Sequence, residues 1–367
     1  MSRAVIVNPY TPKGGGGMYQ PALVCAIRKW ASGSEVYVID AACELRSRYL
    51  GYLCASALVL RRGLHIARAD VLIIQGHFSP ASWVAGTLAR FLRLPFVLIP
   101  HGDFLPDKAL GVVKSSRIKH IAWFLFGRHI VHGARCVVVG GTFERARYLG
   151  YGVSPCRMRE IPNAIEVPYF DTEFGVGLHI RPYVVWLGRV SPEKNLLFLV
   201  RVWEVLKKRG ITVDLHIYGR ADIESEYSNL KNEIEKCGLS DVIRVSDWVD
   251  DRRKFAILQG ALCVVLPSKF ESFGRVVVEA AMVGTPCLAS SGTQWGELNS
   301  LGGGWLPLDV EVWADALARL MEKLGDSRLT REVVAHFRRK YSLDEFQDAW
   351  SEVMHLVQDK VSSSRTL

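Results

Sequence analysis

The sequence has 367 residues, of which 49% are hydrophobic, and a formal net charge of +9. A chain of this length exceeds one typical domain, so we expect two domains with large apolar cores. No apolar run reaches the roughly 18 residues that a membrane-spanning helix needs, and the run at residues 5–10 is too short for a signal peptide. We therefore expect a soluble, cytoplasmic protein.

Short apolar runs alternate with helix-like stretches along the chain. In the first half the runs lie at residues 4–10, 35–40, 70–76, 95–102 and 135–141, with residues 157–168 closing the series. In the second half they lie at residues 183–190, 212–220, 243–249, 262–268 and 286–290. The runs predict buried parallel strands, and their alternation with helices predicts βαβ units. Two such series predict an α/β protein with two Rossmann-like domains facing one cleft.

The boundary between the two series falls near residues 163–170. We therefore expect an N-terminal domain at residues 1–165, a C-terminal domain at residues 166–340 and a final helix at residues 341–360. The final helix is amphipathic, because its apolar residues recur at helical spacing. The residues expected on its apolar face are Phe346, Trp350, Val353 and Leu356.

Basic residues are concentrated in the first half of the chain. Residues 1–160 hold 21 Lys and Arg against 8 Asp and Glu, a balance of +13, whereas the remainder has a balance of −4. This asymmetry predicts contact with an anionic partner, which is a membrane surface, a phosphorylated lipid or a nucleic acid. A basic surface that only aids solubility is the alternative.

One basic helix-like stretch in this half, at residues 117–130, also carries aromatic side chains. Its basic and aromatic residues include Arg117, Lys119, Trp123, Phe124 and Arg128. This combination is typical of interfacial helices that meet anionic membranes. Packing of the aromatic residues in a core is the more common explanation.

Two predicted strands of the first half end at candidate ligand-binding residues. Four consecutive glycines at residues 14–17 follow the first strand and can let a ligand approach the backbone, or form a surface loop. His101 ends a later strand, where it can donate a hydrogen bond to a sugar or phosphate oxygen. A structural role in the turn is equally open for His101. His77 and His120 have weaker claims.

The segment at residues 186–195, WLGRVSPEKN, ends a predicted strand and opens a helix. Ser191 suits the cap of that helix, and Pro192 suits its first turn. Arg189 and Lys194 then flank a helix N-terminus, where two cations beside free N–H groups form a diphosphate clamp. Two solvated surface cations are the alternative.

Glu271 and Glu279 lie in the segment at residues 267–290, which follows another apolar run. The spacing predicts that Glu271 precedes a helix start and that Glu279 lies within the helix, so both carboxylates can border one cleft. Free N–H groups at the helix start would bind phosphate, and the carboxylates would accept hydrogen bonds from sugar hydroxyls. A Glu pair alone is more often solvated, but its position after a buried strand favours a site.

No metal site is predicted. The eight cysteines form no CxxC pair and no cluster with histidines, so we expect reduced residues that lie mostly in cores. Asp250 and Asp251 are explained by helix capping. We therefore predict no essential metal.

Together these motifs resemble the GT4 family of retaining glycosyltransferases. The glycine-rich loop, the His101-Gly102 turn, IPNAIE, GRVSPEKN and ESFGRVVVE occur in this order over nearly the whole chain. The stretch from His101 to IPNAIE looks most like members that build bacterial surface polysaccharides. The resemblance implies a GT-B fold with an acceptor-binding first domain, a nucleotide-sugar-binding second domain and a final helix that crosses back to the first.

The resemblance also implies roles for individual residues. Arg189 and Lys194 match the pair that binds the diphosphate, and Glu271 matches the residue that holds the donor sugar. Glu279 matches the ribose-binding glutamate. Phe273 and Gly274 match residues whose backbone contacts the donor. Gly15 and Gly16 match a first-domain loop near the phosphates and acceptor. His101 matches a residue that lies over the sugar near its anomeric carbon.

Three residues depart from the family pattern: Ala164, Glu166 and Ser272. In the loop at residues 291–297, only Glu297 matches the usual glycine-rich GG-x-x-E pattern. These departures concern details of the donor sugar and the loop conformation.

We expect retaining transfer of a sugar from a nucleotide-diphosphate sugar to a lipid-linked glycan in surface polysaccharide synthesis, with the chain peripheral on the inner membrane face. Cations and helix N–H groups would stabilise the leaving diphosphate, so neither a metal nor another cofactor is expected. A sugar-nucleotide epimerase and a non-catalytic partner subunit with a donor-like site are the alternatives. The absence of helix-turn-helix, RRM and zinc signatures ranks a nucleic-acid partner last.

Overall fold

The computed structural model describes residues 3–9, 15–30, 35–40, 48–102, 117–167, 181–220, 224–322 and 328–365. The chain divides into two compact units. Unit 1 runs to Ala164 and includes the residues from Ser342 onward, and unit 2 runs from Ile165 to Tyr341. The C-terminal helix therefore belongs to the same unit as the N-terminal sheet. Within the described ranges no helix is both long and apolar enough to cross a bilayer.

Unit 1 is built on a six-stranded parallel sheet with the order β2-β1-β3-β4-β5-β6. Its strands are β1 (Arg3–Asn8), β2 (Glu35–Asp40), β3 (Val71–Gln75), β4 (Phe96–Ile99), β5 (Cys136–Val139) and β6 (Met158–Glu160). In the register, Ile6 lies opposite Val38 on one side and Ile73 on the other. β3, β4 and β5 are buried at every residue, as their unbroken apolar runs predicted.

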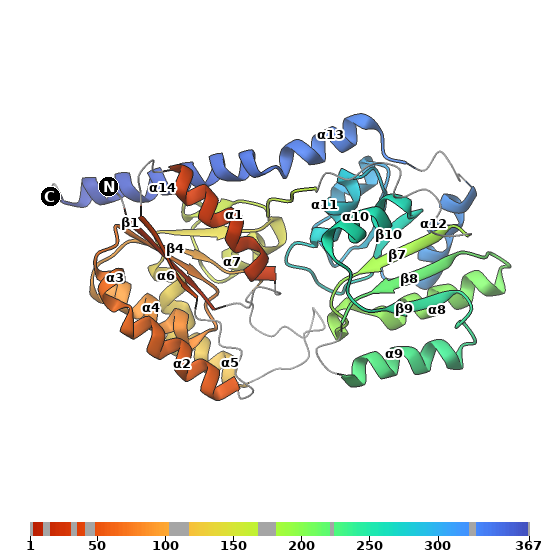
Figure 1. The fold of residues 1–367 in the computed structure, drawn as a ribbon, viewed down its shortest axis with the longest axis horizontal. Coiled ribbons are helices and arrows are strands. Elements are labelled where there is room, and N and C mark those ends of the chain that lie inside the picture. Colours follow the sequence, from red (N-terminus) through yellow and green to blue (C-terminus); the bar gives the residue numbers. More distant parts are fainter. Residues whose placement is uncertain are drawn as a thin grey trace. The chain divides into compact units, whose positions relative to one another are not determined.

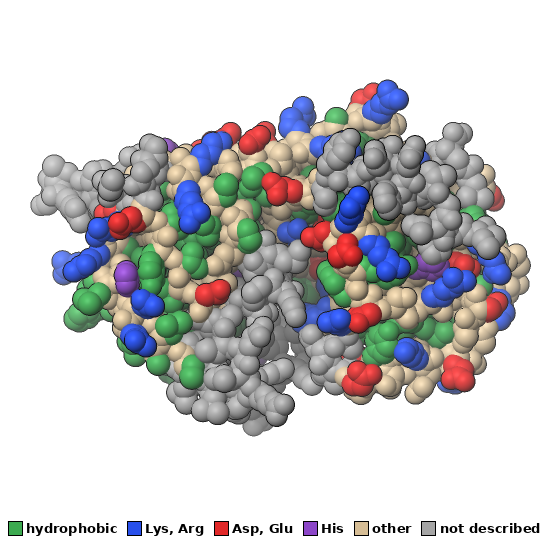
Figure 2. All heavy atoms as spheres, in the orientation of Figure 1, with side chains coloured by type: hydrophobic (Ala, Val, Ile, Leu, Met, Phe, Trp, Pro, Cys, Tyr) green, Lys and Arg blue, Asp and Glu red, His purple; other side chains and the backbone are tan. Residues whose placement is uncertain are grey.

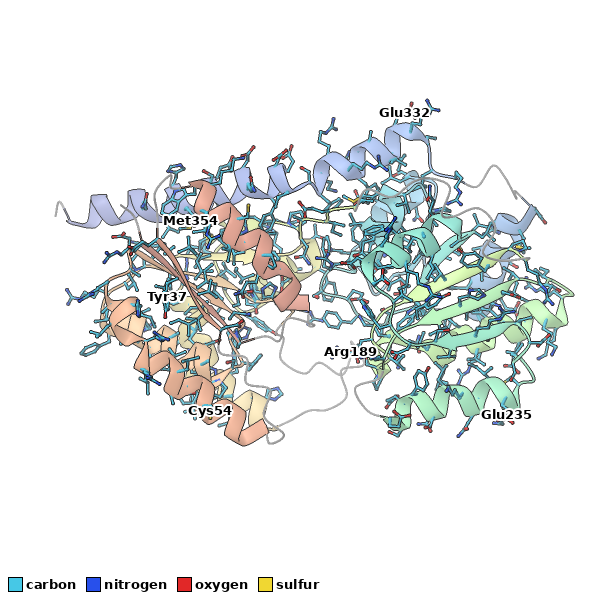
Figure 3. All side chains as sticks on the ribbon, viewed as in Figure 1. Tyr37, Cys54, Arg189, Glu235, Glu332 and Met354 are labelled. Carbon is cyan, nitrogen blue, oxygen red and sulfur yellow. The ribbon has the colours of Figure 1, made fainter. Side chains whose placement is uncertain are left out.

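Helices cover both faces of this sheet (Figure 1). α1 (Gly15–Trp30) and α14 (Leu343–Arg365) pack together on one face, and Met354 of α14 lies beside α1 (Figure 3). The helices that follow β2, β3 and β4 cover the other face. They are α2 (Arg48–Arg61), α3 (Gly63–Ala67), α4 (Pro80–Phe91), α5 (Arg117–Ala122), the π-helical segment η2 (Trp123–Gly127) and α6 (Arg128–Gly133). α7 (Thr142–Gly150) then joins β5 to the last strand.

The apolar face of α14 differs from the prediction at one position. Phe346, Trp350 and Val353 are buried as expected, but Leu356 is only partly buried. A rotation of about 100° per residue carries Leu356 away from the stripe that Trp350 defines. Met354 and Val357 complete that stripe instead.

Unit 2 contains a second six-stranded parallel sheet, with the order β12-β11-β10-β7-β8-β9. Its strands are β7 (Tyr183–Leu187), β8 (Asp214–Tyr218), β9 (Ile243–Ser246), β10 (Cys263–Leu266), β11 (Cys287–Ser290) and β12 (Gly304–Leu306). α8 (Leu196–Lys208), α9 (Glu224–Lys236) and α12 (Val310–Glu322) share one core with the sheet. α10 (Asp251–Gly260), α11 (Arg275–Met282) and α13 (Arg331–Lys340) share the other. The predicted α/β architecture with two parallel sheets is confirmed.

The strand order reverses once in each sheet. In unit 1 the chain passes from β1 to β2 and returns to β3 on the other side of β1. In unit 2 it passes from β7 through β8 to β9 and returns to β10 on the other side of β7. Open α/β sheets bind ligands beyond the carboxyl ends of their strands at such a reversal. The loops after β7 and β10, and those after β1 and β3, are therefore the places to look for a site.

The cysteines only partly follow the prediction of reduced core residues. All seven described cysteines are free, and Cys136, Cys263 and Cys287 are buried. Three others are exposed, because they lie on outward-facing helix or turn positions: Cys25, Cys54 and Cys156.

Candidate active site

Lys194 and Glu271 meet at the strand reversal of unit 2. Lys194 ends the short 3-10 turn η5 (Pro192–Lys194) that follows β7, and Glu271 lies in the loop after β10. The Lys194 ammonium nitrogen is 2.5 Å from Glu271 Oε1, and the two side chains are 17% and 10% exposed. Ser268 Oγ donates a hydrogen bond to the same oxygen at 2.9 Å. The structure therefore brings together two of the predicted site residues as a largely buried ion pair.

Further hydrogen bonds tie the two loops together around this pair. Asn195 has φ 59°, a left-handed conformation that asparagine adopts more readily than most residues. Its Nδ2 donates to the Pro267 carbonyl at 3.2 Å, and the Lys269 N–H donates to the Glu193 carbonyl at 2.8 Å. The ion pair is thus held by backbone and side-chain contacts on both sides.

Arg189 follows the end of β7 (Figure 3) and is 56% exposed. Its Nη2 lies 3.2 Å from Glu193 Oε1. Burial alone would raise the pKa of Glu193, but the hydrogen bond from Ser191 and the charges of Arg189 and Lys194 outweigh it and lower that pKa. Glu193 is therefore ionised at neutral pH beside both predicted cations. Glu193 was not among the predicted site residues.

Ser191 does not cap a helix as predicted. Its Oγ donates to Glu193 Oε1 at 2.6 Å, and no backbone N–H is bonded to it. The carboxylate is the stronger acceptor, and the α-helix begins only at Leu196, beyond η5. Pro192 does occupy the first position of the 3-10 turn.

Glu279 lies within helix α11, as predicted, but its side chain is only 6% exposed. Its Oε1 is 2.9 Å from the Lys254 ammonium nitrogen, and Lys254 is 5% exposed. Arg275 Nε lies 3.7 Å from the same oxygen, and Asp251 Oδ1 lies 2.9 Å from Lys254 Nζ. The predicted ribose-binding carboxylate is therefore one half of a buried ion pair, whose lysine was not anticipated.

Phe273 and Gly274 form the turn between Glu271 and the start of α11. Gly274 has φ 82°, and a Cβ at this position would lie 2.9 Å from Trp295 Nε1, so only glycine fits. The Phe273 carbonyl accepts a hydrogen bond from that indole N–H at 2.8 Å. The first N–H groups of a helix have no partner within it, so this turn presents donors close to Glu271 in the sequence.

Glu297, the match to the usual GG-x-x-E loop, pairs with Lys340 at 3.2 Å and is 35% exposed. Asp250 caps α10, as predicted, by accepting a hydrogen bond from the Arg253 N–H at 2.9 Å. Across the part of the chain that the structure describes, no three His, Cys, Asp or Glu side chains gather as a metal site would require.

In unit 1, His101 lies directly beyond β4 with φ 52°. Its Nε2 is 2.8 Å from Gln75 Oε1, and because an amide oxygen only accepts, Nε2 carries the proton. Gln75 Nε2 donates in turn to Gln20 Oε1 at 3.2 Å, and the Tyr19 ring packs edge-on at 4.9 Å. The ring N–H that was expected to reach a sugar or phosphate is directed at Gln75. His101 thus belongs to a network that spans α1, β3 and the end of β4.

Glu144 organises the turns beside His101 and was not among the predicted site residues. Its side chain is buried in the first turn of α7. Oε1 accepts the Gly102 N–H at 2.7 Å, and Oε2 accepts the Gly140 N–H at 2.7 Å. One carboxylate therefore ties together the turns that follow β4 and β5.

The other candidate site residues of unit 1 each lie in a different structural environment. Gly15 and Gly16 lie in the first turn of α1 and not in a loop, and residues 10–14 before them lie outside the described residues. His77 is buried and its Nδ1 lies 3.1 Å from the Tyr148 hydroxyl, which indicates a structural role. His120 is exposed.

We expect His101 to remain neutral well below neutral pH, because burial lowers its pKa from 6.5 to about 3. Between these values the unfolded chain binds a proton that the native state does not, so the free energy of unfolding falls as the pH falls through this window. The variant His101→Asn, which tolerates the left-handed φ, should flatten this part of the profile in urea unfolding. The same pH slope in variant and wild type would contradict the assignment.

Two α/β units, each built on a six-stranded parallel sheet, are the architecture of a GT-B glycosyltransferase. Residues 17–169 match the model of Glycosyltransferase Family 4, and residues 177–340 match that of the Glycosyl transferases group 1. The chain therefore belongs to the group 1 glycosyltransferases of family 4, and it is an enzyme of this class.

Similar proteins bear this out. The D-inositol 3-phosphate glycosyltransferase of Corynebacterium glutamicum is 30% identical over 72% of this chain and 68% of its own length. The GDP-mannose:cellobiosyl-diphosphopolyprenol alpha-mannosyltransferase of Xanthomonas oryzae pv. oryzae is 26% identical over 82% of this chain and 80% of its own. The structure of Alr3699/HepE from Anabaena in complex with UDP aligns with a TM-score of 0.73 at 17% identity, covering 97% of this chain and 100% of that one. This last likeness shows the GT-B fold.

Proposed function

We propose that this glycosyltransferase moves a sugar from a nucleotide-diphosphate sugar to a glycan acceptor with retention of anomeric configuration. The observation that carries the proposal is the Lys194–Glu271 pair at the strand reversal of unit 2. It offers a cation for the diphosphate and a carboxylate for sugar hydroxyls within 2.5 Å of each other. Arg189 adds a second cation on the same loop.

Charge that builds on the leaving diphosphate would be stabilised by Lys194, Arg189 and the first N–H groups of α11. An ammonium group has three donors, so Lys194 can hold Glu271 and a phosphate oxygen together. On this account no metal or other cofactor is needed, and Glu271 positions the donor without acting as a nucleophile. Glu279 would bind the ribose, while Phe273 and Gly274 contribute backbone contacts.

Unit 2 would thus bind the donor and unit 1 the acceptor. By the family resemblance, Gly15 and Gly16 would lie near the phosphates and acceptor, and His101 near the anomeric carbon of the sugar. We propose a lipid-linked glycan acceptor, used in surface polysaccharide synthesis of the lipopolysaccharide kind. Two facts support this acceptor: the +13 balance of residues 1–160, and a relative named for a diphosphopolyprenol acceptor. The enzyme would then work from the cytoplasm, peripherally on the inner face of an anionic membrane.

The donor site is tested by titrating the protein calorimetrically with UDP, GDP and ADP in EDTA. We expect one diphosphate to bind without metal, and its sugar donor to be transferred with the anomeric configuration retained, as NMR of the product shows. UDP and GDP are both tried because HepE was solved with UDP and the Xanthomonas relative is named for GDP-mannose. Failure of all three diphosphates to bind at millimolar concentration would refute the donor site.

A further inference from the structure

The helices that follow β2, β3 and β4, on one face of the unit 1 sheet, contain no aspartate or glutamate. These helices are α2, α3, α4, α5, the segment η2 and α6, and we call them the acid-free layer. By contrast, the single helix α9 of unit 2 carries four glutamates: Glu224, Glu226, Glu233 and Glu235. The charged residues in the acid-free layer are all basic: Arg48, Arg61, Arg90, Arg117, Lys119 and Arg128.

The same layer exposes large apolar side chains. Figure 2 shows hydrophobic side chains interspersed with Lys and Arg over α2, α3 and α4. In unit 2, among the described residues, the most exposed large hydrophobic side chain is Trp248 at 48%. The acid-free layer and its ends exceed this at six positions: Phe91 (84%), Leu64 (72%), Phe124 (64%), Leu60 (62%), Ile121 (58%) and Leu125 (53%).

The π-helical segment η2 explains how three consecutive apolar residues face solvent. Phe124, Leu125 and Phe126 are all exposed, although successive residues of a helix ordinarily point in different directions. Trp123 packs under the segment, 4.8 Å from the Tyr151 ring, and a Cβ at Gly127 would lie 2.9 Å from the Trp123 ring. The wider turn is therefore anchored on one side and projects the intervening residues outward. Such π segments often mark functional positions.

We propose that the acid-free layer docks on an anionic lipid bilayer, with Phe124 and Leu125 entering the interface and the surrounding arginines binding lipid phosphates. The proposal rests on the proposed function, whose lipid-linked acceptor it places beside unit 1. Apolar side chains set among cations are typical of interfacial helices. Arg128, whose guanidinium lies 5.6 Å above the Phe124 ring, joins both features at one point. A second copy that docked through the same layer would present like charges to it, so the charge favours lipid over a symmetric dimer.

The test is sedimentation of the full chain with vesicles of phosphatidylcholine alone or mixed with phosphatidylglycerol. We expect binding only to the mixed vesicles, weakening as salt rises. The double variant Phe124→Ser/Leu125→Ser should bind at least about tenfold more weakly, because two apolar side chains no longer leave water. Arg61→Glu/Arg128→Glu should also bind more weakly and depend less on salt. The matched unit 2 controls Leu308→Ser and Arg319→Glu should bind as wild type does.

The proposal would be overturned if both double variants bound the mixed vesicles as tightly as the wild type does. It would also be overturned if the wild type did not bind the mixed vesicles. Loss of a dimer in Phe124→Ser/Leu125→Ser during analytical ultracentrifugation, without loss of vesicle binding, would assign the layer to self-association and overturn it too. Phe91→Ser on α4 provides a second apolar variant should the η2 variant fail to fold. Diphosphate titration separates the two proposals. A protein that binds vesicles but no diphosphate would refute the proposed donor site and still support the proposed docking surface.

Discussion

Replacing Lys194 with alanine is expected to lower sugar transfer by about 100-fold to 1000-fold, the loss typical when one stabilising group for transition-state charge is removed. Lys194 lies 2.5 Å from Glu271 at the strand reversal, where the leaving diphosphate is proposed to bind. The variant loses this cation and also leaves a nearly buried carboxylate unpaired. Initial rates at saturating donor measure the effect, and thermal unfolding shows whether the fold is kept.

Glu271→Gln separates the two roles within the pair. It keeps the shape and a hydrogen-bond acceptor for Lys194, so we expect diphosphate affinity to be retained while transfer falls. Arg209→Ala is the matched control, because it breaks a cation–carboxylate contact with Asp315 on the surface of the same unit. Transfer should be unchanged in this control. Near-normal transfer in a folded Lys194→Ala variant would remove the pair from the mechanism.

Much of the fold could be predicted because buried parallel strands require unbroken apolar runs. β10 and β11 are buried at every residue, and a turn residue adjoins one end of each strand and marks that boundary. β12 could not be predicted, because its three residues begin with a glycine and form no such run. The order of the strands in each sheet could not be predicted either, because it depends on which face of the sheet each connecting helix packs against.

Strand order is also why the candidate site could be predicted only in part. Lys194 and Glu271 were each found because they follow an apolar run, but their contact depends on β7 and β10 being neighbours. Glu144 and Lys254 look like ordinary charges near helix starts. Tertiary packing buries both of them, and only then does each acquire its partners.

Glu279→Leu is expected to lower the free energy of unfolding by at most about 3–5 kcal/mol, the cost of leaving one partner of a buried ion pair uncompensated, because Asp251 still lies 2.9 Å from Lys254. Lys254 is 5% exposed, and in the variant only the mostly exposed Asp251 remains as its carboxylate partner. Urea unfolding measures the loss. The exposed pair Lys340–Glu297 is the matched control, and Glu297→Leu there should cost roughly 0–1 kcal/mol.

The double variant Lys254→Met/Glu279→Leu then distinguishes a structural from a ligand-binding carboxylate. Replacing both charges with apolar residues of similar size removes the unpaired lysine, so stability should return to near the wild-type value. If Glu279 also binds the ribose, this folded protein will still bind the nucleoside diphosphate much more weakly than wild type. Equal affinity in the double variant and wild type would show that the pair only supports α10 and α11, and that ribose is held elsewhere.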